Sequence, residues 1–127
     1  MTSEAERRFR ADMVRGVERL KREIGYNATR FLRMVGEYGG AGAARHLLTG
    51  RDASDGFTTL WEHRRLEMSV EAHVLLPWYR ELFSEAQLGT AERRLREHCF
   101  DVDAFLTQSG RNWPAWAQQE HGEDALG

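Results

Sequence analysis

Histidine, cysteine and paired carboxylates are the side chains of this chain that could carry out chemistry. The five histidines and the single cysteine are His46, His63, His73, His98, His121 and Cys99. None of the histidines has the His-Glu-x-x-His spacing of a zinc protease, and one cysteine cannot form a Cys-x-x-Cys site. The spacing therefore predicts no metal site and no cofactor.

His98 and Cys99 are neighbours and could suggest a nucleophile with its base. Adjacent residues on a helix point in different directions, however, and Cys99 falls on the apolar side of its predicted helix. We therefore expect Cys99 to be a buried structural thiol. Asp101 and Asp103 could hold a divalent cation only with ligands from elsewhere, so capping and solvation are the better interpretation. The prediction is a protein that is not an enzyme and has no catalytic residues.

The composition is that of a folded globular domain. The chain has 127 residues, of which 41% are hydrophobic and 30% charged, and this length can bury a substantial core. No apolar run approaches the roughly 20 residues that a membrane span needs. The N-terminal residues lack the apolar segment of a signal peptide, and a single cysteine fits a reducing compartment. We expect a cytoplasmic protein without a membrane partner.

Helical periodicity accounts for most of the chain. Apolar residues recurring every three or four positions predict a long helix over 4–24, which Gly25 ends. Asn27 is expected to cap a second helix, which Gly39-Gly40 breaks before a short helix over 41–48. The same signals predict further helices over 57–64, 70–76, 78–83, 84–99 and 101–107.

Cap residues mark where these later helices begin. Either Ser54 or Asp55 can cap the helix that contains Phe57, and Ser69 can cap the next one. Ser84 and Gln87 match a capping box, with Phe83 and Leu88 as the hydrophobic staple. Trp61 and Trp78 are expected at the centre of the bundle.

These elements predict an all-α fold. We expect a compact orthogonal bundle of about six or seven short helices with a long N-terminal helix, forming a single domain over 1–108. Residues 109–127 are rich in Gly, Gln, Ala and acidic side chains, which predicts a mobile tail. Trp113 and Trp116 lie in that tail, and they are expected either to fold back on the body or to contact a partner.

Charge is unevenly distributed along the chain. Residues 1–51 carry 11 Lys/Arg against 6 Asp/Glu, whereas residues 52–127 carry 7 against 14. The two halves could attract each other in the folded state, which we favour, or the basic half could bind an anionic partner. Residues 26–48 have the outline of a helix-turn-helix with 41–48 as the recognition element, although a hairpin serving the core is favoured. The candidate phosphate contacts are Arg15, Arg19, Arg30, Arg33 and Arg45.

Several motifs make the chain similar to a known family. They are Gly25-Tyr26-Asn27-Ala28-Thr29-Arg30-Phe31-Leu32-x-Met34, Gly39-Gly40, Ala43-Ala44-x-x-Leu47-Leu48, Ser54-Asp55-Gly56-Phe57-Thr58-Thr59-Leu60-Trp61-Glu62 and Ser69-Val70-Glu71-Ala72. From about Phe9 to Phe100 the chain resembles a widespread family of small, largely uncharacterised, all-helical bacterial proteins and domains. Some relatives of this pattern are attached to restriction-type nucleases. The resemblance implies an accessory or recognition module and transfers no catalytic residues. Here His63-Arg64-Arg65 follows Trp61-Glu62, a departure that can change any role of that rim.

Two functional hypotheses follow from the sequence. The first is a non-enzymatic helical module that binds a protein partner or its own copy, with Trp113 and Trp116 as candidate contacts. The second is a weak nucleic-acid-binding module that acts through the basic N-terminal face. Salt dependence separates them, because phosphate binding weakens steeply with ionic strength.

Overall fold

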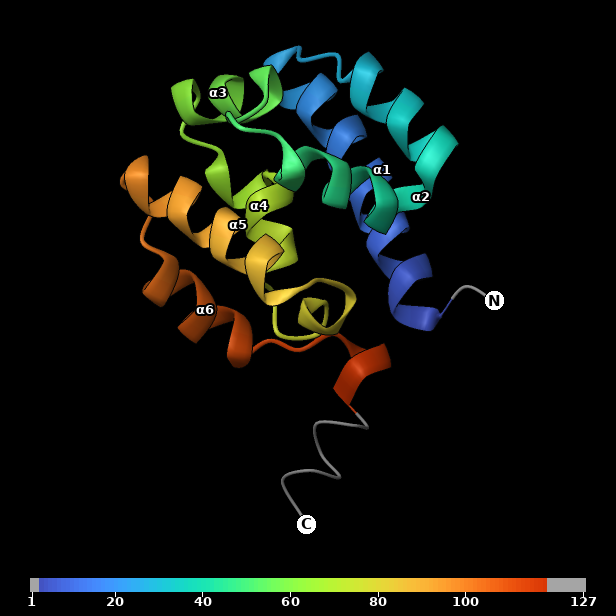
Figure 1. The fold of residues 1–127 in the computed structure, drawn as a ribbon, viewed down its shortest axis with the longest axis vertical. Coiled ribbons are helices and arrows are strands. Elements are labelled where there is room, and N and C mark those ends of the chain that lie inside the picture. Colours follow the sequence, from blue (N-terminus) through green and yellow to red (C-terminus); the bar gives the residue numbers. More distant parts are fainter. Residues whose placement is uncertain (1–2, 119–127) are drawn as a thin grey trace.

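The computed structural model describes residues 3–118, which form only helices and connecting turns (Figure 1). The α-helices are α1 (Glu4–Ile24), α2 (Thr29–Thr49), α3 (Asp55–Glu62), α4 (Val70–Val74), α5 (Glu85–Glu97) and α6 (Val102–Gly110), and the short 3-10 helices are η1 (Leu66–Met68) and η2 (Arg80–Leu82). Residues 115–118 add a last helical turn. The predicted all-α bundle with a long N-terminal helix is confirmed.

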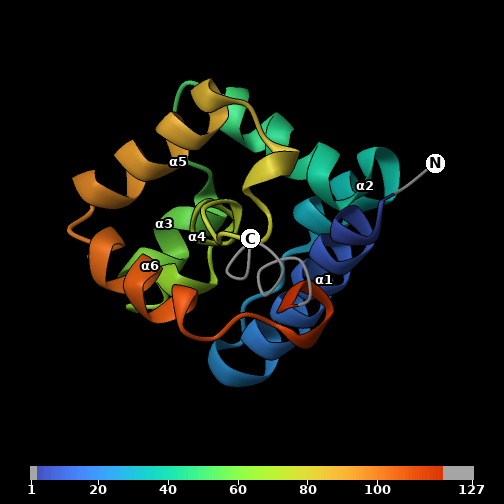
Figure 2. The ribbon, with the colours of Figure 1, turned by 90° about the horizontal axis from the view of Figure 1, so that it is seen from below.

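The helices form a ring around α4. α1 and α2 lie side by side along one flank, and α5 and α6 form the opposite flank (Figure 1). Seen from below, α4 lies near the middle of this ring (Figure 2). Ala72, Val74 and Leu75 are buried there, as expected for a helix that is apolar nearly all round.

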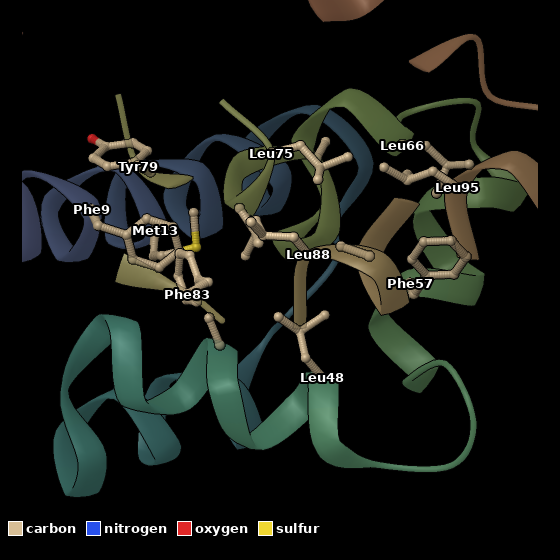
Figure 3. Close-up of a cluster of buried hydrophobic side chains, with 14 of the residues drawn as sticks. Phe9, Met13, Leu48, Phe57, Leu66, Leu75, Tyr79, Phe83, Leu88 and Leu95 are labelled. Atoms are coloured by element: carbon tan, nitrogen blue, oxygen red, sulfur yellow. The ribbon is translucent and has the colours of Figure 1, made fainter. Parts of the chain in front are cut away.

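The core is continuous from one end of the bundle to the other (Figure 3). At one end Phe9 packs edge-on against Tyr79, with ring centroids 5.1 Å apart, and against Phe83 at 5.4 Å. Leu75 and Leu88 lie in the middle. Phe57, Leu66 and Leu95 form the other end.

α1 and α2 cross at a glycine. A Cβ atom on Gly40 would lie 2.7 Å from the Cα of Arg10, which is closer than two carbon atoms can approach. The preceding Gly39 has φ 79° and separates α2 into two helical halves, a conformation that glycine adopts without steric cost. The predicted break at Gly39-Gly40 is confirmed. The positive φ favours glycine at position 39, and the close crossing requires it at position 40.

Serine side chains cap four of the helices, the first being Ser3, which accepts a hydrogen bond from the Glu6 amide at the start of α1. The hydroxyl oxygens of Ser54 and Ser69 accept hydrogen bonds from the amides of Phe57 and Ala72, each at 3.1 Å. Ser54 rather than Asp55 is therefore the cap of α3. Ser84 forms the predicted capping box with Gln87.

The start of α2 differs from the prediction. Ala28 occupies the N-cap position and makes no side-chain cap bond, so the expected cap at Asn27 is wrong by one residue. The structure describes Asn27 as exposed and in an irregular turn. The first turn of α2 thus keeps its backbone amides without a capping side chain.

Two side chains expected inside the core are exposed. Trp61 is 47% exposed because α3 buries Phe57 and Leu60, and the next residue along a helix points about 100° away. Cys99 is also exposed. α5 ends at Glu97, and Cys99 has φ 62° beyond that end, so helical periodicity does not apply to it.

The packed region extends past the expected boundary at residue 108. α6 continues to Gly110, and Trp113 lies against Trp78 with ring centroids 5.6 Å apart. Trp116 lies 5.8 Å from the ring of Tyr79. Trp113 and Trp116 therefore fold back on the body, which is one of the two arrangements expected for them. The rest of the predicted tail, 119–127, lies outside the described residues.

Candidate binding cavity

A cavity of about 410 Å³ lies between α1, α2, α3, η1 and the start of α4. Its walls are mainly apolar, and the methionine and aromatic side chains among them are Met13, Met34, Met68, Tyr26, Phe31 and Phe57. This volume is within the range of cavities that enclose a small ligand or several side chains. Residues 3–118 leave this space open.

Methionines are concentrated in this cavity. Met13, Met34 and Met68 line it from three different elements, and the only other methionine of the chain, Met1, lies outside the described residues. The methionine side chain is flexible and polarizable, so it adapts to irregular apolar partners. The cavity wall can therefore adjust to what enters.

The cavity wall is built from three helix starts that are far apart in sequence. Residues 26–31 lead into α2, residues 53–57 into α3 and residues 68–71 into α4, and every one of these segments contributes lining residues. The same segments carry the most distinctive motifs of the sequence, where caps and turns are dense. Those motifs therefore shape a cavity in addition to starting helices.

A polar cluster borders the cavity on the α1 side. The Tyr79 hydroxyl donates a hydrogen bond to Asp12, which also forms an ion pair with Arg15. Burial and this hydrogen bond raise the pKa of Tyr79 above its ordinary value, so the phenol stays protonated. The cluster holds α1 against Tyr79.

His73 lies next to this cluster and also lines the cavity. Its Nδ1 donates to the carbonyl oxygen of Ser69 at 2.9 Å. Burial lowers the pKa of His73, and the nearby charge of Asp12 opposes this only in part. His73 is therefore neutral at pH 7 and adds no charge to the cavity.

A buried ion pair supports the opposite wall. Arg94 Nη1 donates to Glu71 Oε2 at 3.2 Å and to the carbonyl oxygen of Leu47 at 3.1 Å, while Nη2 donates to that of Gly50 at 2.6 Å. Burial raises the pKa of Glu71, and the Arg94 charge acts against this rise. The pair joins the start of α4 to α5 and to the C-terminal end of α2.

This ion pair was not predicted from the sequence, although the sequence contains two features that indicate it. Segment 70–76 is apolar except for Glu71 and a histidine, and Glu71 is its only carboxylate. Arg94 directly precedes the core residue Leu95 in the sequence. A charge in such a position is usually paired when it is buried. The partner, however, follows only from the packing of α4 on α5.

Arg45, one of the candidate phosphate contacts, is half-buried against the body of the bundle. Its Nε and Nη2 atoms donate to the carbonyl oxygen of Leu82 at 3.2 and 2.8 Å, and its guanidinium lies 5.8 Å from the ring centroid of Phe83. The helical half of α2 that was considered as a recognition element is also buried, through Ala41, Ala43, Ala44 and Leu48. The geometry is that of a hairpin packed into the core.

The other candidate phosphate contacts are not brought into one cluster. Arg15 pairs with Asp12, and Arg19 Nε lies 2.6 Å from Glu23 Oε2. Arg30 and Arg33 are exposed near the start of α2, and no carboxylate within residues 3–118 forms an ion pair with either. Arg30 also lines the cavity.

The predicted partner contacts lie away from the cavity. Trp113 and Trp116 are half-buried against Trp78 and Tyr79. In the described part of the chain, no three His, Cys, Asp or Glu side chains are grouped to hold a metal ion. His121 lies outside that part. None of the helices in residues 3–118 is both long and apolar enough to span a bilayer.

Comparison with known proteins gives no relative for this arrangement. No protein-family model, curated protein or solved structure matches the chain.

Proposed function

We propose that this chain is a non-enzymatic helical module that binds a protein partner by taking an apolar segment of it into the cavity. The observation that carries the proposal is an open, largely apolar cavity into which Met13, Met34 and Met68 converge. Burial of apolar surface drives most protein association, and adaptable methionine walls suit such an interface.

The rim of the cavity supports a protein partner. Asp55 and Arg30 are exposed at its edge and have opposite charges, while the interior is apolar. An apolar centre inside a polar, solvent-accessible rim is the usual anatomy of a protein interface. The rim charges would orient the partner segment, and the methionine side chains would supply most of the contact.

Gly16 offers a way to close the cavity without damaging the fold. It lies in α1 and lines the cavity, and a Cβ atom added there meets no other atom within 4 Å. Gly16→Leu should place an apolar side chain in the cavity. Because leucine favours a helix over glycine by up to about 1 kcal/mol, the folded chain should be at least as stable.

The test compares this variant with Gly36→Leu. Gly36 is exposed in α2, is equally free of contacts and does not line the cavity. Tagged wild-type and variant chains are exposed to extract from the source cells. A partner should be retained by the wild type and Gly36→Leu and lost with Gly16→Leu. Adding the purified partner should then shift the methyl NMR signals of the lining methionines. If no protein distinguishes the two variants, the proposal fails.

Nucleic-acid binding is the second candidate, and the exposed pair Arg30 and Arg33 favours it. The proposal here is weak phosphate contact by the first half of α2. Labelled single- and double-stranded DNA should bind at low salt and dissociate at moderate salt. Replacement of both arginines by glutamine should abolish binding, and an absence of binding at low salt excludes this candidate.

A further inference from the structure

A second surface hollow lies where α3 and α5 end. This groove of about 530 Å³ is lined by Trp61, Glu62, Arg64, Leu66, Glu67, His98, Cys99 and Phe100. It shares no lining residue with the cavity, and its residues come from the C-terminal ends of α3 and α5 and from η1 with the turn before it. It is a separate surface and does not depend on the function proposed for the cavity.

Trp61 is the central feature of this groove. Its ring packs edge-on against His98, with ring centroids 5.2 Å apart, and His98 packs in the same way against Phe57 at 4.8 Å. The His98 ring is held in place because its Nδ1 donates to the carbonyl oxygen of Arg94 at 2.7 Å. Trp61 is thus fixed by a supported ring while remaining 47% exposed.

The charges around Trp61 are mainly negative. Glu62 and Glu67 are exposed carboxylates at the groove, and neither forms an ion pair with another described residue, although the charge of Glu67 contributes to the raised pKa of Arg19. The C-terminal ends of α3 and α5 add the partial negative charge of their last carbonyl groups. Arg64 is the only Lys or Arg side chain that lines the groove.

The backbone at the two helix ends is unusual in the same place. Arg64 has φ 58° and Cys99 has φ 62°, and they are the non-glycine residues with positive φ in the part of the chain that the structure describes. This left-handed conformation is normally taken by glycine after a helix, and any other residue type is disfavoured there. Both turns direct residues with side chains into the groove.

We propose that this groove binds a lysine- or arginine-bearing segment of a protein partner, with the cationic side chain lying on Trp61 between Glu62 and Glu67. A cation above an indole ring is attracted by the negative face of the ring. The carboxylates and helix ends reinforce that attraction. A nucleic acid does not fit, because its phosphates would meet the same negative groups.

The test uses the Trp61 indole N–H signal in NMR, assigned with Trp61→Phe. Short blocked peptides that contain two arginines or two lysines are titrated into the whole chain at low salt, with the glutamate peptide as control. The basic peptides should give a saturable shift that weakens with salt, and the glutamate peptide should give none. An equal response to both charge types, or no saturable response, overturns the proposal.

Variants that remove negative charge and a variant that removes positive charge should change peptide binding in opposite directions. Glu62→Gln and Glu67→Gln should each weaken binding of the arginine peptide by about twofold to fivefold. Arg64→Gly should strengthen it, because it removes the competing cation, and should also raise Tm by relieving the positive φ. Gly89→Ala, in α5 and outside the groove, is the control, which should raise Tm and leave peptide affinity unchanged. Weaker binding of the arginine peptide by Arg64→Gly would overturn the proposal, because Arg64 would then not compete with the bound cation.

A second copy of this chain is the remaining occupant to be tested, since its own first helix is rich in arginine. Sedimentation of the wild type and of Trp61→Ala at low salt distinguishes a separate protein partner from a second copy of this chain. A wild type that stays monomeric at peptide-binding concentrations supports a separate partner. A dimer that disappears in Trp61→Ala would replace that partner with a second copy and overturn the proposal.

Discussion

The Glu71 carboxylate and the Arg94 guanidinium meet inside the bundle, 3.2 Å apart, with side chains only 3% and 4% exposed. Arg94 also bonds the backbone carbonyls of Leu47 and Gly50. One guanidinium thus joins α4, α5 and the C-terminal end of α2. The wall of the cavity on this side depends on that junction, because both Leu47 and Glu71 line it.

Removing one partner of this pair should be strongly destabilising. Arg94→Met leaves the Glu71 carboxylate buried without its cation, and we expect the free energy of unfolding to fall by about 3–5 kcal/mol. Urea denaturation followed by circular dichroism measures this loss. The double variant with Glu71→Leu should recover much of it, since no charge then stays buried. Equal losses in the single and double variants would show that the pair does not act as a unit.

The crossing of α1 and α2 makes Gly40 intolerant of a side chain. Gly40→Ala should lower the free energy of unfolding by about 1–3 kcal/mol, because the added methyl group collides with the Arg10 backbone. Gly89→Ala is the matched control, since its Cβ would meet nothing within 4 Å in the exposed middle of α5. It should stabilise the chain by up to about 1 kcal/mol. Similar Tm shifts for both variants would contradict the close crossing.

His73 should make stability depend on pH. Burial lowers its pKa in the folded chain, whereas in the unfolded chain the group titrates near its ordinary value of 6.5. Below that value the unfolded state binds a proton that the folded state does not. The free energy of unfolding should therefore fall as the pH drops from about 7 to about 5, and change little above pH 7.

His73→Asn isolates this effect. Its side-chain amide can still donate to the Ser69 carbonyl but does not titrate, so the pH dependence between 7 and 5 should become flatter. Chemical denaturation at a series of pH values gives both profiles. Carboxylate contributions cancel in the difference between wild type and variant. Parallel profiles would mean that the His73 pKa is not lowered.

The packing of the C-terminal segment predicts a difference between two tryptophans. Trp116 packs on Tyr79 and belongs to the edge of the core, so Trp116→Ala should lower the free energy of unfolding by about 1–3 kcal/mol. Trp61 is half exposed, and Trp61→Ala should cost less. Thermal melts of the two variants test this ranking. A silent Trp116→Ala would indicate that residues 111–118 do not pack on the body in solution.

Local sequence signals allowed the helix starts to be predicted. The position of each side chain relative to the other helices did not follow from these signals. Ser69 and Ser84 cap helices through bonds to residues only three positions away, so a short stretch of sequence contains the whole interaction. The break at Gly39 is local in the same sense. Trp61 and Cys99 were misplaced because their exposure depends on where α3 and α5 end and on which neighbours they meet.

The cavity could not be predicted for a related reason. Each of its three helix starts was visible as a motif, but nothing in the sequence says that they meet. Arg45 shows the same limit, since its carbonyl partner Leu82 is 37 positions away. Caps and periodicity therefore determine the elements, and the site arises from their contacts.

The grouping of Met13, Met34 and Met68 in one cavity has a chemical consequence. Oxidants convert methionine to a polar sulfoxide, and reductases reverse the change. In the described part of the chain, the remaining core is built of Leu, Val, Phe, Tyr and Ala, which lack a thioether. Within residues 3–118, oxidation of thioethers would therefore change the wall of this one cavity, and enzymatic reduction would restore it.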